Sequence, residues 1–174
     1  MLKVNLKGLQ QFTVKMVPKL ADGASIVNIA SLAGIGWPAA VDQIEEFETV
    51  DWADIKTFVE RHRMDEGGRS YFFSKEALVV WTMRNRWTWR DRGIRMNAVS
   101  PGPVDTPILQ DFIETLGDRA EEDMRVMDRP GHPTDVAPVV AFLLSDAAAW
   151  FRGNNLTPDG GMSSHLMLHM NGIE

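Results

Sequence analysis

Hydrophobic positions recur along the chain with two different periods, and the change from one period to the other predicts the elements. Residues 6–20 carry apolar side chains at roughly helical spacing and end before Ala21, Asp22 and Gly23. Residues 25–30 are short, β-branched and almost continuously apolar, which is typical of a strand covered on both faces. These two segments predict a helix that packs on a sheet.

The alternation of helical and extended segments continues toward the C-terminus. The expected elements are a helix over 71–90 ended by Gly93, a strand over 94–99, a stiff turn over 100–103, a polar helical flap over 107–130, a helix over 135–145 capped by Thr134, and a strand over 153–159. Such a series is typical of an α/β fold. We therefore expect residues 1–174 to form a single α/β domain with a parallel sheet.

Residues 36–70 interrupt this alternation. The segment is rich in Asp and Glu and closes with Gly67 and Gly68. We interpret it as an acidic, partly helical insertion within the domain, with most of its charges on a solvated face. Four aromatic residues predict that one side of the insertion still packs, namely Trp37, Phe47, Trp52 and Phe58.

Composition narrows the class of protein. The chain has 174 residues, of which 44% are hydrophobic and 24% charged, as in one globular domain or a large piece of one. A net charge of −6 without a basic cluster argues against nucleic acid as a partner. Cysteine is absent, which excludes disulfides and thiol chemistry. Neither a signal peptide nor a run of about 18 apolar residues is present, so we expect a cytoplasmic protein without a membrane partner.

Candidate chemistry lies at the start of the helix over 71–90 and at the end of the strand before it. Tyr71 and Lys75 are four residues apart, so they share one helix face with Cβ atoms about 6 Å apart. A tyrosine phenol has an unperturbed pKa of about 10 and is a slow base unless a nearby cation favours the phenolate. Ser31 follows the strand over 25–30 and could donate a hydrogen bond to a substrate oxygen. The three residues together predict a base, the cation that activates it and a positioning hydroxyl.

Each of these features also has a structural explanation. A Tyr and a Lys one turn apart are common, Ser31 could cap a turn, and Pro101 with Gly102 could merely end a strand. Their order, each at a predicted strand end or helix start, favours an active site. Other chemistry is disfavoured: Ser31 lacks the GxSxG context of a hydrolase nucleophile. His165 and His169 could bind a metal, but we expect a docked or loose C-terminal tail there and no metal site.

The motifs carry a resemblance that runs nearly from end to end. They are Val4-Asn5-Leu6-x-Gly8, Ile26-Val27-Asn28-Ile29-Ala30-Ser31, Tyr71-x-x-x-Lys75, the segment from Ile94 through Asn97-Ala98-Val99-Ser100-Pro101-Gly102-Pro103-Val104-Asp105-Thr106, and Asp159-Gly160-Gly161. In this order they resemble the short-chain dehydrogenase/reductase family. The resemblance implies an oxidoreductase that transfers hydride between NAD or NADP and a small-molecule alcohol or ketone.

The same resemblance assigns roles to residues. It implies that Asn5, Ser31, Tyr71 and Lys75 are catalytic, with Asn5 supporting a proton-relay water near Lys75. It also implies that the cofactor is held by Lys75, Pro101, Gly102, Val104 and Thr106. In the family, the backbone of Val104 and the hydroxyl of Thr106 would hold the nicotinamide carboxamide.

The long insertion between Ser31 and Tyr71 is similar to that of the subgroup containing 3α-hydroxysteroid dehydrogenase/carbonyl reductase and the bacterial coniferyl-alcohol dehydrogenases. This similarity implies a bulky apolar alcohol as substrate. It also implies a homodimer formed through the last helix and strand.

One family feature has no counterpart in these residues. Pyrophosphate binding needs a glycine-rich turn that leads into a helix, and Gly34-Ile35-Gly36 is followed by Trp-Pro instead. The resemblance therefore implies that residues 1–174 are a single incomplete Rossmann-like domain, the C-terminal part of a doubly wound parallel sheet, without the N-terminal half of the family domain. We also expect the strand over 25–30 to be an uncovered edge. The alternative hypothesis is a truncated, inactive fragment that acts at most as a binding or oligomerisation module. The choice between NAD and NADP stays open.

Overall fold

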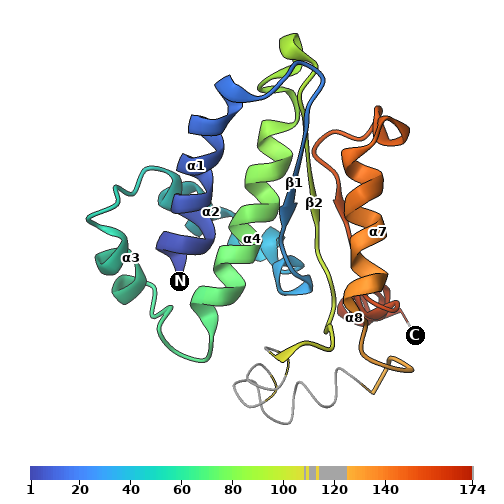
Figure 1. Cartoon of the computed structure of the whole chain (residues 1–174). Helices are drawn as coiled ribbons and strands as arrows, with labels where there is room; N and C mark the ends of the chain where they lie inside the picture. The colour runs from blue at the N-terminus through green and yellow to red at the C-terminus, as the bar shows by residue number, and fades with distance from the viewer. Residues whose placement is uncertain (108, 110–112, 114–124, 174) are drawn as a thin grey trace.

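The computed structural model describes residues 1–107, 109, 113 and 125–173. Three parallel strands form its sheet, and helices lie on both sides (Figure 1). The strands are β1 (Ser25–Ile29), β2 (Arg95–Val99) and β3 (Asn155–Leu156). The α-helices are α1 (Leu9–Met16), α2 (Val41–Glu48), α3 (Ile55–Arg61), α4 (Arg69–Arg84), α7 (Pro133–Leu144) and α8 (Met162–Met170).

Short helical segments of other types join these elements. They are the π-helix η1 (Lys3–Gly8) and the 3-10 helices η2 (Val17–Lys19), η3 (Leu32–Gly34), η4 (Trp37–Ala40), η5 (Asn85–Trp87), η6 (Arg90–Arg92) and η7 (Asp146–Ala148). The helix expected over 6–20 is thus a continuous path through η1, α1 and η2. The helix expected over 71–90 begins two residues earlier, and its α-helical part ends at Arg84.

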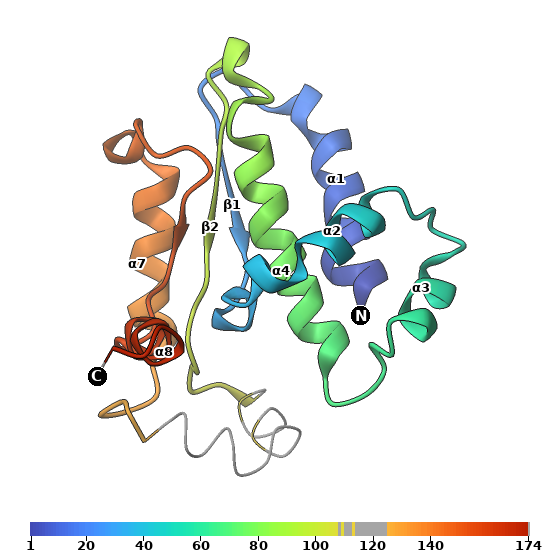
Figure 2. The same cartoon turned by 180° about the vertical axis from the view of Figure 1, so that it is seen from behind.

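The strand order is β1-β2-β3, with Ser25 opposite Arg95 and Ala98 opposite Asn155. All five residues of the central strand β2 are buried. Helix α4 covers one face of the sheet and α7 covers the other, as the two opposite views make clear (Figures 1 and 2). This parallel sheet between helices confirms the predicted α/β fold class, part of a doubly wound Rossmann-like sheet.

Strand β1 lies at the edge of the three-stranded sheet formed by the described residues. The expectation that it is covered on both faces holds only in part, because Ile29 is 49% exposed whereas Asn28 is buried. Asn28 Nδ2 donates to Thr82 Oγ1 at 2.9 Å, which ties the strand to α4. The edge position of β1 in this sheet matches the expectation of an uncovered edge strand.

The main core lies between α4 and the segment over 36–70. Phe47 of α2, Phe58 of α3 and Phe73 of α4 are each about 2% exposed or less, with ring centroids 4.8 to 5.6 Å apart. The segment therefore shares the hydrophobic core of α4. The expected packing of Trp52 is wrong: its side chain is 45% exposed and lies beneath the ammonium of Lys3.

Two further predictions have the wrong bounds, and a third concerns residues that the structure mostly does not describe. The last strand spans only Asn155–Leu156, and α7 begins at Pro133 instead of Asp135. Most of the flap expected over 107–130 lies outside the described residues. None of the helices that the structure describes combines the length and the apolar character needed to span a bilayer.

Candidate active site

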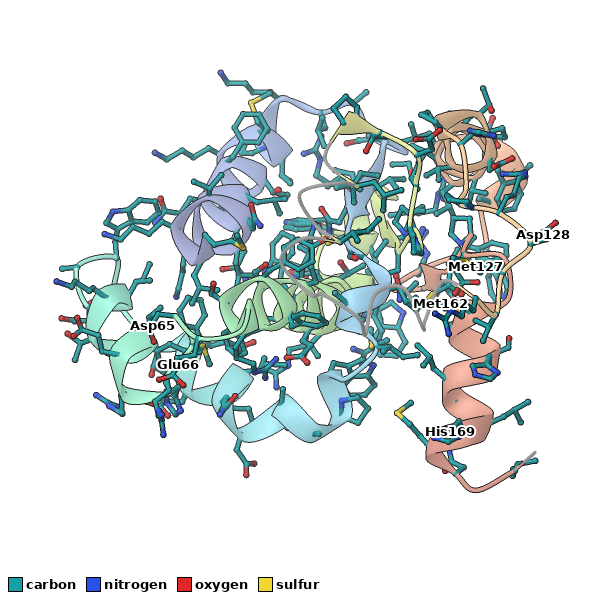
Figure 3. All side chains as sticks on the ribbon, turned by 90° about the horizontal axis from the view of Figure 1, so that it is seen from below. Asp65, Glu66, Met127, Asp128, Met162 and His169 are labelled. Carbon is teal, nitrogen blue, oxygen red and sulfur yellow. The ribbon has the colours of Figure 1, made fainter. Side chains whose placement is uncertain are left out.

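The carboxyl ends of the three strands lie at the same edge of the sheet because the strands are parallel. Helix α4 runs antiparallel to them, so its first turns lie at this edge, the lower end in Figure 1. Figure 3 looks onto this end of the molecule. Ligands of open α/β sheets bind at this end, and the residues predicted for the active site belong to it.

Lys75 projects from α4 toward the end of β1. Its Nζ donates to the carbonyl oxygen of Ile29 at 3.0 Å and lies 5.7 Å from the centroid of the Tyr71 ring. Burial lowers the pKa of Lys75 below its ordinary value of 10.5. The structure therefore brings Lys75 and Tyr71 together, with the amine held by a backbone carbonyl.

Ser31 follows β1 after Ala30 and precedes η3. Its Oγ accepts a hydrogen bond from the backbone N–H of Ala33 at 3.2 Å, so the hydroxyl caps this short helix. The hydroxyl proton is not used by this bond, because the oxygen acts as acceptor. Ser31 thus keeps a donor while its side chain is oriented by the turn.

A close backbone contact holds the Ser31 turn against α4. A Cβ atom placed on Gly34 would lie 2.9 Å from the carbonyl oxygen of Lys75 and 3.1 Å from Val79 Cγ2. Such distances are too short for a real side chain, so only glycine allows the turn and the helix to approach this closely. The contact sets the separation between Ser31 and the helix that carries Lys75.

Asn5 lies in η1, which packs against α4. Its backbone N–H donates to the carbonyl oxygen of Met1 at 2.9 Å. The structure therefore places Asn5 on an element adjacent to the helix of Tyr71 and Lys75, and its part in a proton relay stays a prediction.

The turn after β2 is joined to both neighbouring strand ends. The N–H of Leu32 donates to the carbonyl oxygen of Pro101 at 2.9 Å, and the N–H of Gly102 donates to that of Pro158 at 3.3 Å. A Cβ atom on Gly102 would lie 2.8 Å from the Cβ of Asp159. Pro101 and Gly102 are thus fixed between the Ser31 turn and the end of β3.

The N–H and C=O of Val104 point away from the segment around Gly131, with which the neighbouring residues are hydrogen-bonded. In a parallel bridge, Gly131 N–H donates to the Pro103 carbonyl oxygen at 2.9 Å and Asp105 N–H donates to the Gly131 carbonyl oxygen at 2.7 Å. This pattern turns the N–H and C=O of Val104 to the opposite side. Thr106 Oγ1 lies 3.3 Å from the Val104 carbonyl oxygen and donates to it. One donor and one acceptor on the same side match the needs of a primary carboxamide.

A cavity of about 190 Å³ adjoins this bridge. It lies between the turn after β2, the segment before α7 and the end of β3. Its lining residues include Pro103, Met127, Gly131, Val136, Pro158 and Gly160. Figure 3 shows Met127 on the side of α8, close to Met162, at this end of the molecule.

Sequence reasoning missed three groups in this region. They are the Ile29 carbonyl that holds Lys75, Gly131 of the parallel bridge, and the Asp159 carboxylate, whose oxygens accept from Gly161 N–H and Ser163 N–H at 2.9 Å. Only Asp159 had a sequence signal, because an aspartate ahead of two glycines and a helix is a typical cap. The other two act through their backbone, which sequence alone does not reveal.

The histidine pair of the C-terminal helix lies apart from these groups. His165 and His169 stack with centroids 6.5 Å apart on the exposed side of α8. Among the residues placed by the structure, no cluster of three or more His, Cys, Asp or Glu side chains is arranged to hold a metal ion.

Comparison with known proteins identifies the family. A family model described as enoyl-(acyl carrier protein) reductase matches residues 55–163, well over half of the chain. The chain belongs to the short-chain dehydrogenase/reductase family. This assignment confirms the resemblance carried by the ordered motifs.

Two curated members of the family share much of this sequence. Coniferyl-alcohol dehydrogenase of Pseudomonas sp. strain HR199 is 35% identical over 92% of this chain and 64% of its own length. The 3-alpha-hydroxysteroid dehydrogenase/carbonyl reductase of Comamonas testosteroni is 32% identical over 67% of this chain and 46% of its own length. The chain therefore spans about half to two thirds of the length of these relatives.

A solved family structure shares the fold. The 3-alpha-hydroxysteroid dehydrogenase of Pseudomonas sp. B-0831, complexed with NADH, superposes with a TM-score of 0.67 at 31% identity. The match covers 82% of this chain and 56% of that one. That family member was solved with the nicotinamide cofactor NADH bound.

The residues present fit one end of such a cofactor. The outward peptide groups of Val104, the Thr106 hydroxyl and the Lys75 amine supply donors and an acceptor for a carboxamide and a ribose. The 174 residues contain no glycine-rich turn of the kind that binds pyrophosphate. The fit therefore extends to the nicotinamide end.

Proposed function

We propose that this chain carries the catalytic residues of an NAD(P)-dependent alcohol dehydrogenase or carbonyl reductase. One observation carries the proposal: Lys75 Nζ lies 3.0 Å from the Ile29 carbonyl oxygen and 5.7 Å from the Tyr71 ring, at the edge where Ser31 follows β1. This arrangement puts a cation, a phenol and a hydroxyl at the ligand-binding end of the sheet.

The catalytic residues move a proton to or from the substrate oxygen. Tyr71 takes the hydroxyl proton of an alcohol on its Oη, or returns it to a carbonyl in the reverse direction. Ser31 donates its hydroxyl proton as a hydrogen bond to the same oxygen, and the positive charge of Lys75 favours negative charge on the phenol oxygen. Asn5, on the element beside α4, would support proton exchange with solvent.

The cofactor-binding residues act at the turn after β2. When bound, the nicotinamide ring accepts or supplies the hydride. The N–H and C=O of Val104, with the Thr106 hydroxyl, would bind the carboxamide, and Lys75 would bind the ribose. Pro101 and Gly102 would form the ledge beneath the ring, a position that their bonds to Leu32 and Pro158 keep fixed.

A bulky apolar alcohol is the proposed substrate class. Similarity to coniferyl-alcohol dehydrogenase and to 3-alpha-hydroxysteroid dehydrogenase/carbonyl reductase supports it. The cavity beside Pro103 adjoins the turn after β2 and is lined by apolar Met127 and Val136 together with charged residues, so the support for an apolar substrate comes from the relatives.

Turnover with purified full chain tests the proposal. Coniferyl alcohol or a 3α-hydroxysteroid is incubated with NAD or NADP, and reduced cofactor is followed by absorbance. Tyr71→Phe should reduce the rate at least about 100-fold, since it removes the proton acceptor. Tyr71 is the sole tyrosine of the chain, so no other phenol can replace it. The matched control is Lys56→Met on α3, where the native side chain is 82% exposed, and it should retain full activity.

The second candidate is a fragment without turnover that acts as a binding or oligomerisation module. The absence of a glycine-rich phosphate turn from the 174 residues and the exposed edge of β1 favour it. A wild-type chain that neither binds NADH in a fluorescence titration nor turns over any substrate would support this candidate and contradict the first.

The proposed partner is a second copy of the chain, and the proposed compartment is the cytoplasm. Helix α8 exposes three large apolar side chains, Met167, Leu168 and Met170, at 47% to 62%. Met167→Glu should convert a dimer to a monomer in light scattering after gel filtration. Val14→Glu on α1, at a residue equally exposed in the native chain, is the control and should leave the mass unchanged.

A further inference from the structure

We infer that Asp135 is a positioning residue that fixes the Val104 peptide for carboxamide binding by holding Gly131 in place. The inference rests on the proposed function for the identity of the ligand, and on hydrogen bonds of the described residues for the holding itself. Neither the motifs quoted above nor the predicted site residues include Asp135.

The Asp135 carboxylate holds the chain on both sides of Gly131. Its Oδ2 accepts from the N–H of His132 at 2.7 Å and from Arg129 Nη1 at 2.8 Å, and its Oδ1 accepts from Arg129 Nη2 at 3.3 Å. A forked guanidinium-carboxylate pair restricts geometry more than a single charge contact does. Arg129 Nη1 also donates to the Pro130 carbonyl oxygen at 2.9 Å, which closes the loop over residues 129–132.

Gly131 transmits this restraint to the turn after β2. Its N–H and C=O form the two bonds of the parallel bridge, to Pro103 and Asp105. Val104 lies between these two partners, so its peptide orientation follows the position of Gly131. A displaced Gly131 would release Val104 without changing any residue that touches the ligand.

Asp135 lies on a helix that is packed against the sheet. It belongs to the first turn of α7, whose length packs against β1 and β2. At the far end of this helix, buried Arg95 of β2 donates to the carbonyl oxygens of Leu143 and Ser145 at 3.1 and 3.0 Å. The carboxylate is therefore attached to the sheet through a helix that packs on two strands and is bonded to β2 at its far end, so it can hold a loop.

Amide hydrogen exchange of the full-length chain, followed by NMR, tests the inference directly. Asp135→Asn should lower the protection of the Gly131 and Asp105 amides about three- to fivefold, because the Arg129–Asp135 pair is half exposed and the Asn oxygen can still accept one bond. The amides of β2 should keep their protection, which shows that the chain still folds. Arg129→Gln should act in the same direction, and the double variant should be no worse than Asp135→Asn alone.

Asp128→Asn is the matched control. Asp128 Oδ1 accepts from the Arg129 N–H at 3.1 Å, and Figure 3 shows its side chain at the outer edge of the segment, away from α7. This variant makes the same chemical change in the loop seven residues before Asp135 and should leave both amides protected. Unchanged protection in Asp135→Asn, or equal loss in Asp128→Asn, would overturn the inference.

Titration with NADH separates this inference from the proposed function. If wild-type chain binds NADH, Asp135→Asn should weaken the affinity by up to about three- to fivefold, whereas Asp128→Asn should not. If the wild type does not bind NADH, the cofactor part of the proposed function fails, and the exchange experiment still decides whether Asp135 holds Gly131.

Discussion

The ion pair between Arg69 and Glu76 gives a sharp stability prediction. Arg69 Nη1 lies 2.7 Å from Glu76 Oε2, and the Glu76 side chain is only 7% exposed whereas that of Arg69 is 33% exposed. Arg69 Nη2 also donates to Gln43 Oε1 of α2 at 3.4 Å. The pair therefore joins the start of α4, which carries Tyr71, to the segment over 36–70.

The unequal burial of the two partners predicts unequal effects. Arg69→Met leaves a buried carboxylate without its cation, and breaking a buried pair in this way costs about 3 to 5 kcal/mol. We expect about 3 kcal/mol, because part of Arg69 is hydrated. Glu76→Gln leaves a guanidinium that water can reach and an amide oxygen that still accepts a bond, so we expect about 1 kcal/mol. Lys56→Met breaks an exposed pair and should cost less than about 0.5 kcal/mol.

Urea denaturation followed by tryptophan fluorescence and circular dichroism measures these values, since the chain has six tryptophans. With a slope of about 2 kcal/mol per molar, Arg69→Met should lower the midpoint by about 1.5 M. The double variant Arg69→Met with Glu76→Met should be more stable than Arg69→Met alone, because it leaves no unpaired buried charge. Equal midpoints for Arg69→Met and Lys56→Met would refute the reasoning.

Three further outcomes are expected. Phe47→Ala should lower the unfolding free energy by about 3 to 5 kcal/mol in urea, through the cavity left among the three core rings; a loss below about 1 kcal/mol would contradict this packing. Arg129 and the His132 N–H hold the pKa of Asp135 at about 2, below an unfolded value near 4. The ionised Asp135 carboxylate therefore stabilises the loop above about pH 4, and this stabilisation is lost as the pH falls through about 2. The exchange protection of the Gly131 amide should be constant from pH 7 to 4 and decrease below pH 4. A decrease between pH 7 and 5 would contradict this prediction. Burial lowers the pKa of Lys75, so its charge destabilises the fold at neutral pH and this effect fades as the pH rises through the lowered pKa. Lys75→Met should thus abolish turnover without lowering the urea midpoint at pH 7, and a lower midpoint than that of Lys56→Met would argue against it.

The order and type of the elements could be predicted from the sequence because periodicity reports burial. The short extended segment over 94–99 became the fully buried β2, although Arg95 and Asn97 alternate there with apolar residues, and the helical spacing after Tyr71 became α4. The end of each predicted strand also located the candidate site, since parallel strands end at a common edge. These inferences need only local patterns and one rule of α/β topology.

Hydrogen bonds that depend on the position of a loop could not be predicted in this way. The cap of α7 shows the reason: Thr134 is a good capping residue by type, yet the bond that forms is from the His132 N–H to the Asp135 side chain. Both patterns are compatible with the same sequence, and the position of the preceding loop decides between them. Trp52 likewise looked like a core residue by type, but the turn that carries it lies outside the aromatic cluster.

Backbone contacts also explain why the candidate site is built around glycines as well as reactive side chains. Gly34 brings the Ser31 turn onto α4, and Gly102 brings the turn after β2 onto Asp159. The first contact joins the turn of Ser31 to the helix of Tyr71 and Lys75, and the second joins cofactor-binding candidates to the capping residue Asp159. Because a backbone contact at van der Waals distance has almost no freedom to adjust, it fixes distances between reactive groups more tightly than flexible side chains could. The position of Lys75 relative to Ser31 therefore depends on the glycine at position 34 as well as on the bonds of the Lys75 amine.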